Sequence, residues 1–144
     1  MDREELQNIL PHRAPMLLVD ESTVQEDGSV ASAYTIPENP WFTQGHFPGY
    51  PVVPGVILCE IMAQSSVLLI PRELLVTNLA MYGGLDGVKF KGSVFPGDKV
   101  CVTSRLSSIR PPLVVVEAEA RVNGKVCCKG TLKFMLVPKD KLGL

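Results

Sequence analysis

Residues 45–70 of this chain read GHFPGYPVVPGVILCEIMAQSSVLLI, and this stretch decides the fold. Its first half is so rich in proline and glycine that regular secondary structure is excluded there. Its second half follows Pro54 and Gly55, and a proline in the first turn of a helix costs no hydrogen bond. We therefore expect a helix over residues 56–70 that ends before Pro71. Because this helix is apolar on every face, the rest of the protein should enclose it.

Turn signals divide most of the remaining chain into extended segments. We expect a short helix over residues 2–9, and then strands at residues 16–27, 29–36, 79–82, 85–91, 99–109, 113–122 and 125–137. Asn123-Gly124 is the clearest turn, since both residues tolerate the positive φ of a tight hairpin. The pattern predicts an α+β fold in which an antiparallel sheet of about seven strands wraps around the long central helix.

The length, charge and hydropathy of the chain exclude several classes of protein. A chain of 144 residues fits one domain, residues 1–144, and its 14 basic and 15 acidic residues are interspersed, so no basic stripe suggests nucleic acid. The uncharged stretch over residues 40–59 is interrupted by prolines, which excludes a membrane-spanning helix. The chain also starts without the basic and apolar regions of a signal peptide. We expect a cytoplasmic protein that does not enter membranes.

Metal and cofactor chemistry finds no support in the sequence. Only two histidines are present, and no cysteines have the CxxC spacing of a zinc site. We expect neither a metal nor a cofactor. The cysteines should be reduced and serve as small core residues; they are Cys59, Cys101, Cys127 and Cys128.

Glu60 is the one charged residue of the apolar helix. An ionised carboxylate is costly to remove from water, so this group should be hydrogen-bonded, paired or used in chemistry. Gln64 lies four residues further along the same helical face and could make Glu60 a purely structural group. Alternatively, burial raises its pKa and lets it donate a proton near neutral pH.

His46 lies fourteen residues before this glutamate, in the rigid turn GHFPG. A histidine can accept a proton at neutral pH and act as a general base, although a structural histidine is equally compatible with the turn. Gly55 at the helix start either polarises a carbonyl oxygen with its backbone N–H or only initiates the helix. A base, an acid and an oxyanion donor without a nucleophile motif suit elimination or addition of water beside a carbonyl, or isomerisation of a double bond.

Three segments resemble the β-hydroxyacyl-acyl carrier protein dehydratases of the FabZ type. They are GHFPGYPVVPGVILCEIMAQ (45–64), LPHRAPMLLVD (10–20) and VKFKGSVFPGDKV (88–100). The resemblance implies a hot-dog fold and a homodimer, commonly assembled into a hexameric trimer of dimers. It also implies a substrate carried by acyl carrier protein in fatty acid biosynthesis.

The same resemblance implies a role for each site residue. His46 would remove the α-proton of a (3R)-hydroxyacyl thioester, and Glu60 of the other subunit would protonate the departing hydroxyl, giving the trans-2-enoyl product. The backbone N–H of Gly55 would bind the thioester carbonyl. The backbone carbonyl of Val52 would orient the His46 ring, and Gln64 would hold Glu60 in place.

Three other hot-dog functions remain as alternatives: a dehydratase that also isomerises its product, a thioesterase, and a non-catalytic acyl-binding subunit. The isomerising group usually has aspartate where this chain has Glu60. The chain departs from the family at Gly92, where a second basic residue is common, and this change could weaken docking of the acidic carrier. The basic residues that could compensate are Lys89, Lys91, Arg105 and Arg110.

Overall fold

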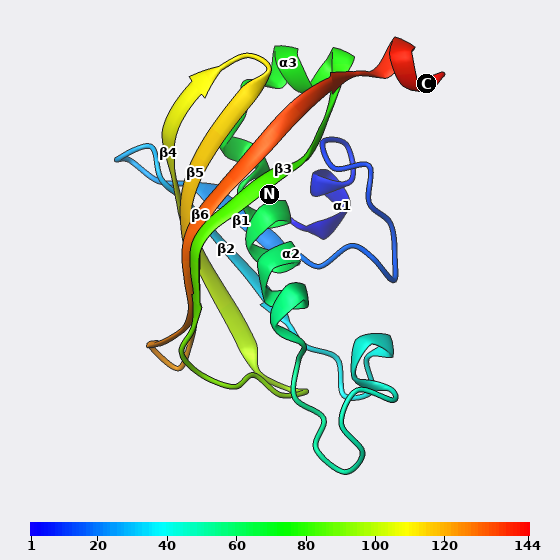
Figure 1. Cartoon of the computed structure of the whole chain (residues 1–144), viewed down its shortest axis with the longest axis vertical. Helices are drawn as coiled ribbons and strands as arrows, with labels where there is room; N and C mark the ends of the chain where they lie inside the picture. The colour runs from blue at the N-terminus through cyan, green and yellow to red at the C-terminus, as the bar shows by residue number, and fades with distance from the viewer.

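The computed structural model describes residues 1–144 as one strongly curved antiparallel sheet with a helix in its hollow (Figure 1). The strands are β1 (Glu21–Val24), β2 (Val30–Thr35), β3 (Asn78–Phe90), β4 (Lys99–Arg110), β5 (Leu113–Val122) and β6 (Lys125–Pro138). The helices are α1 (Arg3–Leu6), α2 (Gly55–Ser65) and α3 (Arg72–Thr77), with short 3₁₀ turns η1 (Trp41–Thr43), η2 (Val67–Leu69) and η3 (Lys139–Leu142). The strand order is β1-β2-β4-β5-β6-β3. The expected sheet around a central helix is confirmed.

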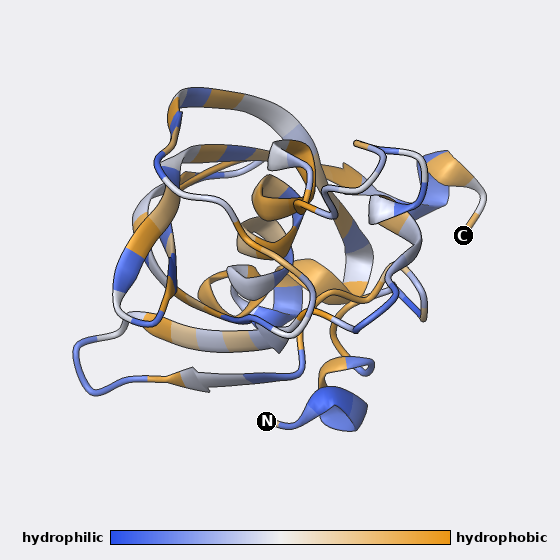
Figure 2. Cartoon of the chain, turned by 90° about the horizontal axis from the view of Figure 1, so that it is seen from below, coloured by the Kyte–Doolittle hydropathy of each residue, from blue (hydrophilic) through white to orange (hydrophobic).

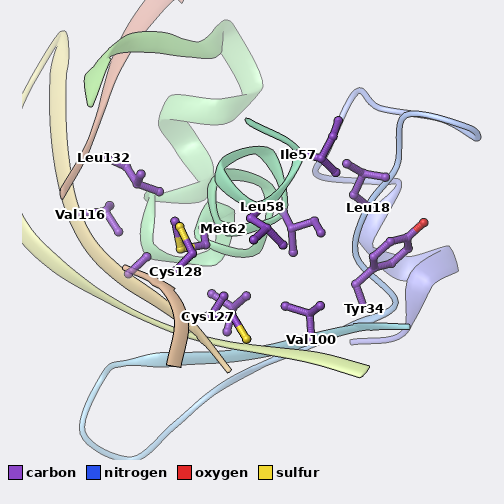
Figure 3. Close-up of a cluster of buried hydrophobic side chains, with 14 of the residues drawn as sticks. Leu18, Tyr34, Ile57, Leu58, Met62, Val100, Val116, Cys127, Cys128 and Leu132 are labelled. Atoms are coloured by element: carbon purple, nitrogen blue, oxygen red, sulfur yellow. The ribbon is translucent and has the colours of Figure 1, made fainter. Parts of the chain in front are cut away.

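Helix α2 forms the core together with the inner face of the sheet. Viewed from the end, its mainly apolar turns lie inside the curve of the strands (Figure 2). Met62 lies on the side of the helix that faces Val116 of β5 and Leu132 of β6, Leu58 lies beside Met62, and all four side chains are buried (Figure 3). The alternation of apolar and polar residues in β5 places every second side chain in this core. No helix of the structure is long and apolar enough to cross a membrane.

The central helix is shorter than the sequence predicts. It ends at Ser65, and η2 replaces the expected last turns. The Ser66 hydroxyl donates a hydrogen bond of 2.7 Å to the Met62 carbonyl, and such local bonds compete with regular helix geometry. The expectation of a fully enclosed helix is also wrong at its start, where Val56 is 74% exposed.

Strand β3 replaces the two short strands that the sequence predicts, so the sheet has six strands rather than seven. Gly83-Gly84 is not a turn but a bulge, at which the pairing of β3 with β6 changes register. A Cβ atom on Gly83 would lie 2.8 Å from Cγ of Met135, so any larger residue here would force the Met135 side chain to move. Helix α3, which begins directly after Pro71, was not expected from the sequence.

The hairpin turn expected at Asn123-Gly124 is confirmed. Asn123 and Gly124 have φ values of 51° and 78° and join β5 to β6. The expected helix over residues 2–9 is reduced to α1, and the expected strand over residues 16–27 is reduced to β1. The carbonyls just before β1 do not enter a strand ladder because they accept hydrogen bonds from the Arg3 guanidinium.

Candidate active site

Glu60 lies midway along α2 and borders a cavity of about 410 Å³. The cavity is enclosed by residues 7–13, helices α2 and α3, strand β3 and η3, and 11 of its 20 lining residues are hydrophobic. The Glu60 side chain is 23% exposed, so the carboxylate is largely removed from water but still reachable from the cavity. An acid in a mostly apolar pocket can act on a substrate without competition from bulk water.

Two polar side chains approach the same oxygen of Glu60. Gln64 Nε2 donates to Oε1 at 2.9 Å, and His12 Nε2 lies 3.4 Å from Oε1. Burial of the carboxyl raises its pKa, but the interactions with His12 and Gln64 outweigh burial, so the pKa of Glu60 lies below its ordinary value. The sequence-based expectation of a raised pKa is therefore wrong for the single chain.

His46 lies in the loop between β2 and α2, which extends beyond the first turn of α2 (Figure 1). Its ring packs on Phe47, with the ring centroids 4.0 Å apart, and its backbone N–H donates to the Thr43 carbonyl. The loop is shaped by Gly45 and Gly49, which have φ values of 76° and 74°. The half-buried ring makes no side-chain hydrogen bond within the chain, so the contact with the Val52 carbonyl stays a prediction.

The single chain does not bring the two chemical groups together. His46 is absent from the lining of the Glu60 cavity, although Gln64 and His12 both reach it. The structure thus joins Glu60 to its predicted support, Gln64, and leaves His46 on a separate loop.

The first turn of α2 offers free backbone donors. The N–H groups of Ile57 and Leu58 both turn back to the Pro54 carbonyl, whereas those of Gly55 and Val56 have no partner in the chain. The space that a side chain at position 55 would take is filled by the ring of Phe90. These two N–H groups and the positive end of the helix dipole can bind a carbonyl oxygen.

Gly55→Ala should test how tightly this turn is packed. The new Cβ would lie 2.8 Å from Cε1 of Phe90, and because Phe90 is 56% exposed its ring can turn aside. We expect the free energy of unfolding to fall by about 1 kcal/mol at most, measured by chemical denaturation at one protein concentration. In a Phe90→Ala background, where the ring is gone, the same substitution should be neutral or slightly stabilising. Equal losses in both backgrounds would show that Phe90 is not the cause.

Two residues of the cavity were not singled out from the sequence. Tyr82 donates a hydrogen bond of 2.6 Å to the Cys59 carbonyl and joins β3 to α2; burial and then the nearby Glu60 charge raise the pKa of its hydroxyl. His12 is separated from Glu60 by 48 positions in the chain, so no local spacing reveals their contact. The available signal is its place in LPHRAPMLLVD (10–20), one of the three segments that carry the family resemblance.

Comparison with known proteins gives a consistent result. Residues 10–131 match the family model of the FabA-like domain. The chain is 44% identical over 135 residues to the 3-hydroxyacyl-[acyl-carrier-protein] dehydratase FabZ of Streptococcus equi subsp. zooepidemicus, which covers 93% of this chain and 96% of that protein. The FabZ of Streptococcus pyogenes serotype M3 is also 44% identical, over 93% and 97% of the two chains.

Solved structures share the architecture at low sequence identity. The dehydratase heterocomplex ApeI:P from Xenorhabdus doucetiae aligns with a TM-score of 0.78 at 22% identity, over 95% of this chain and 93% of that chain. A mutant of the fluoroacetyl-CoA-specific thioesterase FlK aligns with a TM-score of 0.66 at 16% identity, over 86% and 94%. At these identities the likeness concerns the fold alone.

Proposed function

This chain belongs to the FabA-like domain family, among its FabZ-type dehydratases with the hot-dog fold, and from this we propose that it eliminates water from a (3R)-hydroxyacyl thioester on acyl carrier protein. The product is the trans-2-enoyl thioester of fatty acid biosynthesis, and the cytoplasm is the proposed location. The observation that carries the proposal is a carboxylate in a cavity with a mainly hydrophobic lining. One of its oxygens accepts a hydrogen bond from Gln64 and lies 3.4 Å from His12 Nε2, and the other oxygen has no hydrogen-bond partner in the chain. Such a group can exchange a proton with a bound hydroxyl.

Each site residue has a definite part in the proposed reaction. The His46 imidazole of one subunit takes the α-proton, and the resulting negative charge on the thioester oxygen is stabilised by the Gly55 N–H. Glu60 of the partner donates a proton to the β-hydroxyl, which leaves as water. The Val52 carbonyl orients the His46 ring, and Gln64 holds the carboxyl.

Glu60 must carry a proton at the moment of elimination, whereas its pKa is lowered in the single chain. A partner loop and an acyl chain over the cavity would remove more water from the carboxyl. Desolvation disfavours the charged form and raises the pKa, so assembly and substrate binding both favour the protonated acid.

The edge of the sheet supports a dimer. Strand β3 is an outermost strand, is thirteen residues long and exposes Met81, Leu85 and Phe90 by 48%, 44% and 56%. A long apolar edge with unpaired backbone groups is a surface for pairing with another chain. Pairing through β3 would place the partner beside the Glu60 cavity, which β3 helps to enclose. We propose a homodimer as the active unit and a trimer of dimers as its larger assembly.

A cluster of lysines supports docking of an acidic carrier protein. Lys89 of β3 lies opposite Lys129 of β6, and Lys91 follows directly after the end of β3. The charge of Lys129 lowers the pKa of Lys91. Phe90 lies within this cluster and its ring covers Gly55, so a carrier docked there would meet the start of α2. Arg105 lines the same surface groove as Lys89 and Lys129, but its charge is partly balanced by Asp27, with which it pairs at 2.8 Å.

An assay with three substrates tests the proposed function. The purified protein, incubated with 3-hydroxyacyl, trans-2-enoyl and plain acyl thioesters of acyl carrier protein, should interconvert the first two and leave the third intact. Release of a free thiol from plain acyl thioester would identify a thioesterase, and a shifted double bond would identify an isomerising dehydratase. Acyl binding without turnover of any substrate would indicate a binding subunit. The same series on coenzyme A thioesters identifies the preferred carrier.

A further inference from the structure

The contact between His12 and Glu60 is not explained by the roles assigned so far. His12 Nε2 lies 3.4 Å from Glu60 Oε1, the oxygen that also accepts the 2.9 Å hydrogen bond from Gln64. Glu60 Oε2 accepts no hydrogen bond within the chain. The two oxygens of one carboxylate are thus made unequal by their surroundings.

The segment that carries His12 is firmly held. Gln64 Nε2 also donates to the Met16 carbonyl at 2.8 Å, and Gln64 Oε1 accepts from the Leu18 N–H at 2.8 Å. The Arg13 guanidinium closes the turn around His12 by donating to three nearby backbone carbonyls. His12 is therefore placed by backbone contacts on both sides, which is the condition for holding another group in a fixed geometry.

The surroundings of the His12 ring indicate which nitrogen bears the hydrogen. Nδ1 is shielded from solvent and has no hydrogen-bond partner. A buried N–H without an acceptor is more costly and rarer than a buried acceptor without a donor. The hydrogen of a neutral His12 ring is accordingly assigned to Nε2, where it faces Glu60 Oε1. Catalytic hydrogen bonds that are long in a free protein commonly shorten when substrate binds.

We infer that His12 is a positioning residue for Glu60: together with Gln64 it fixes Oε1 and leaves Oε2 as the oxygen that gives its proton to the departing hydroxyl. This inference rests on the proposed dehydration and adds to it a residue outside the His46 and Glu60 pair. His12 itself does not touch the substrate.

The proton balance of the step is simple. The α-carbon loses its proton to the partner's imidazole, the electron pair forms the new carbon–carbon double bond, and the bond from the β-carbon to oxygen breaks. The departing hydroxyl takes the proton from Oε2 and leaves as water. His12 keeps its Nε2 hydrogen throughout, and the ionised Glu60 is then best stabilised by the two donors on Oε1.

Two substitutions of His12 test whether this residue positions Glu60 or only stabilises the fold. His12→Ala removes the donor, whereas His12→Gln can place an amide N–H near the position of Nε2. For His12→Ala we expect kcat to fall by about tenfold to a hundredfold with KM changed by less than about twofold, because the lost interaction matters for the reacting carboxyl. His12→Gln should recover most of this loss, while thermal unfolding records the stability of each variant.

Several results would overturn the inference. They are a kcat of His12→Ala within about twofold of the unsubstituted protein, equal losses in His12→Ala and His12→Gln, or a rise in KM without a fall in kcat. If His12→Ala does not fold, His12→Asn replaces it, because its shorter side chain keeps the polarity but cannot reach Glu60; His12→Gln should then exceed His12→Asn in kcat. Failure of the proposed function is distinguishable, since the unsubstituted protein would then not dehydrate any 3-hydroxyacyl substrate.

Discussion

Glu60→Gln should leave the fold and assembly intact and lower the rate of dehydration by at least about 10³. The amide has nearly the same shape as the carboxyl and can still accept the hydrogen bond from Gln64 through its oxygen. It has no acidic proton to give to the departing hydroxyl, so the elimination loses its acid. The rate is measured as enoyl thioester formed per chain, with circular dichroism and light scattering to confirm folding and assembly.

His46→Ala should cause a loss of the same order, because the α-proton then has no base. The substitution concerns a half-buried loop residue whose side chain makes no hydrogen bond in the chain, so little stability should be lost. The unsubstituted protein, measured at the same protein concentration, is the reference. Near-normal turnover in either Glu60→Gln or His46→Ala, with folded protein, would refute the acid and base roles.

Mixing the two inactive variants should restore activity. His46 does not reach the Glu60 cavity within one chain, so each site is proposed to take its base from one subunit and its acid from the other. A mixed dimer then holds one intact site and one site that lacks both groups. If subunits pair at random after equal mixing, half of the dimers are mixed, and about a quarter of the original rate should return.

A third variant supplies the matched control for this experiment. When His46→Ala is mixed with a chain that carries both substitutions, no subunit provides a base, and no activity should return. Subunit exchange is verified by mass spectrometry of differently labelled chains. If exchange is complete and the two single variants still show no recovery, the acid and base must come from the same chain, and the shared site would be wrong.

The sequence predicts the architecture well because its signals are local. Pro54 before an apolar run specifies the start of α2, and Asn123-Gly124 supplies the positive φ values that its hairpin needs. Where the predictions were wrong, distant contacts decided the outcome. Gly83-Gly84 resembles a turn in the sequence, but pairing with β6 continues across it as a bulge.

In the site, too, local sequence signals predict some features, whereas distant contacts determine the others. Glu60 and Gln64 are four residues apart on one helix, so their contact follows from helical geometry. The direction of the pKa shift of Glu60 could not be predicted from the helix alone. Burial raises this pKa, but His12, together with Gln64, lowers it by more. His12 is brought near by tertiary packing. The proposed role of His46 at Glu60 requires a second chain, and no spacing within one sequence can locate a group on a second chain.

The contacts of Gln64 restrict which amino acid can occupy position 64. Its NH₂ group donates to both Met16 and Glu60, and its oxygen accepts from Leu18, so every polar atom of the amide has a fixed direction. Glutamate is of the same size but has no hydrogen to donate and would set a second negative charge against Glu60. Leucine fills similar volume but leaves the Leu18 N–H buried without an acceptor. Evolutionary or designed variation at this position is therefore confined to side chains that present a donor and an acceptor at the same reach.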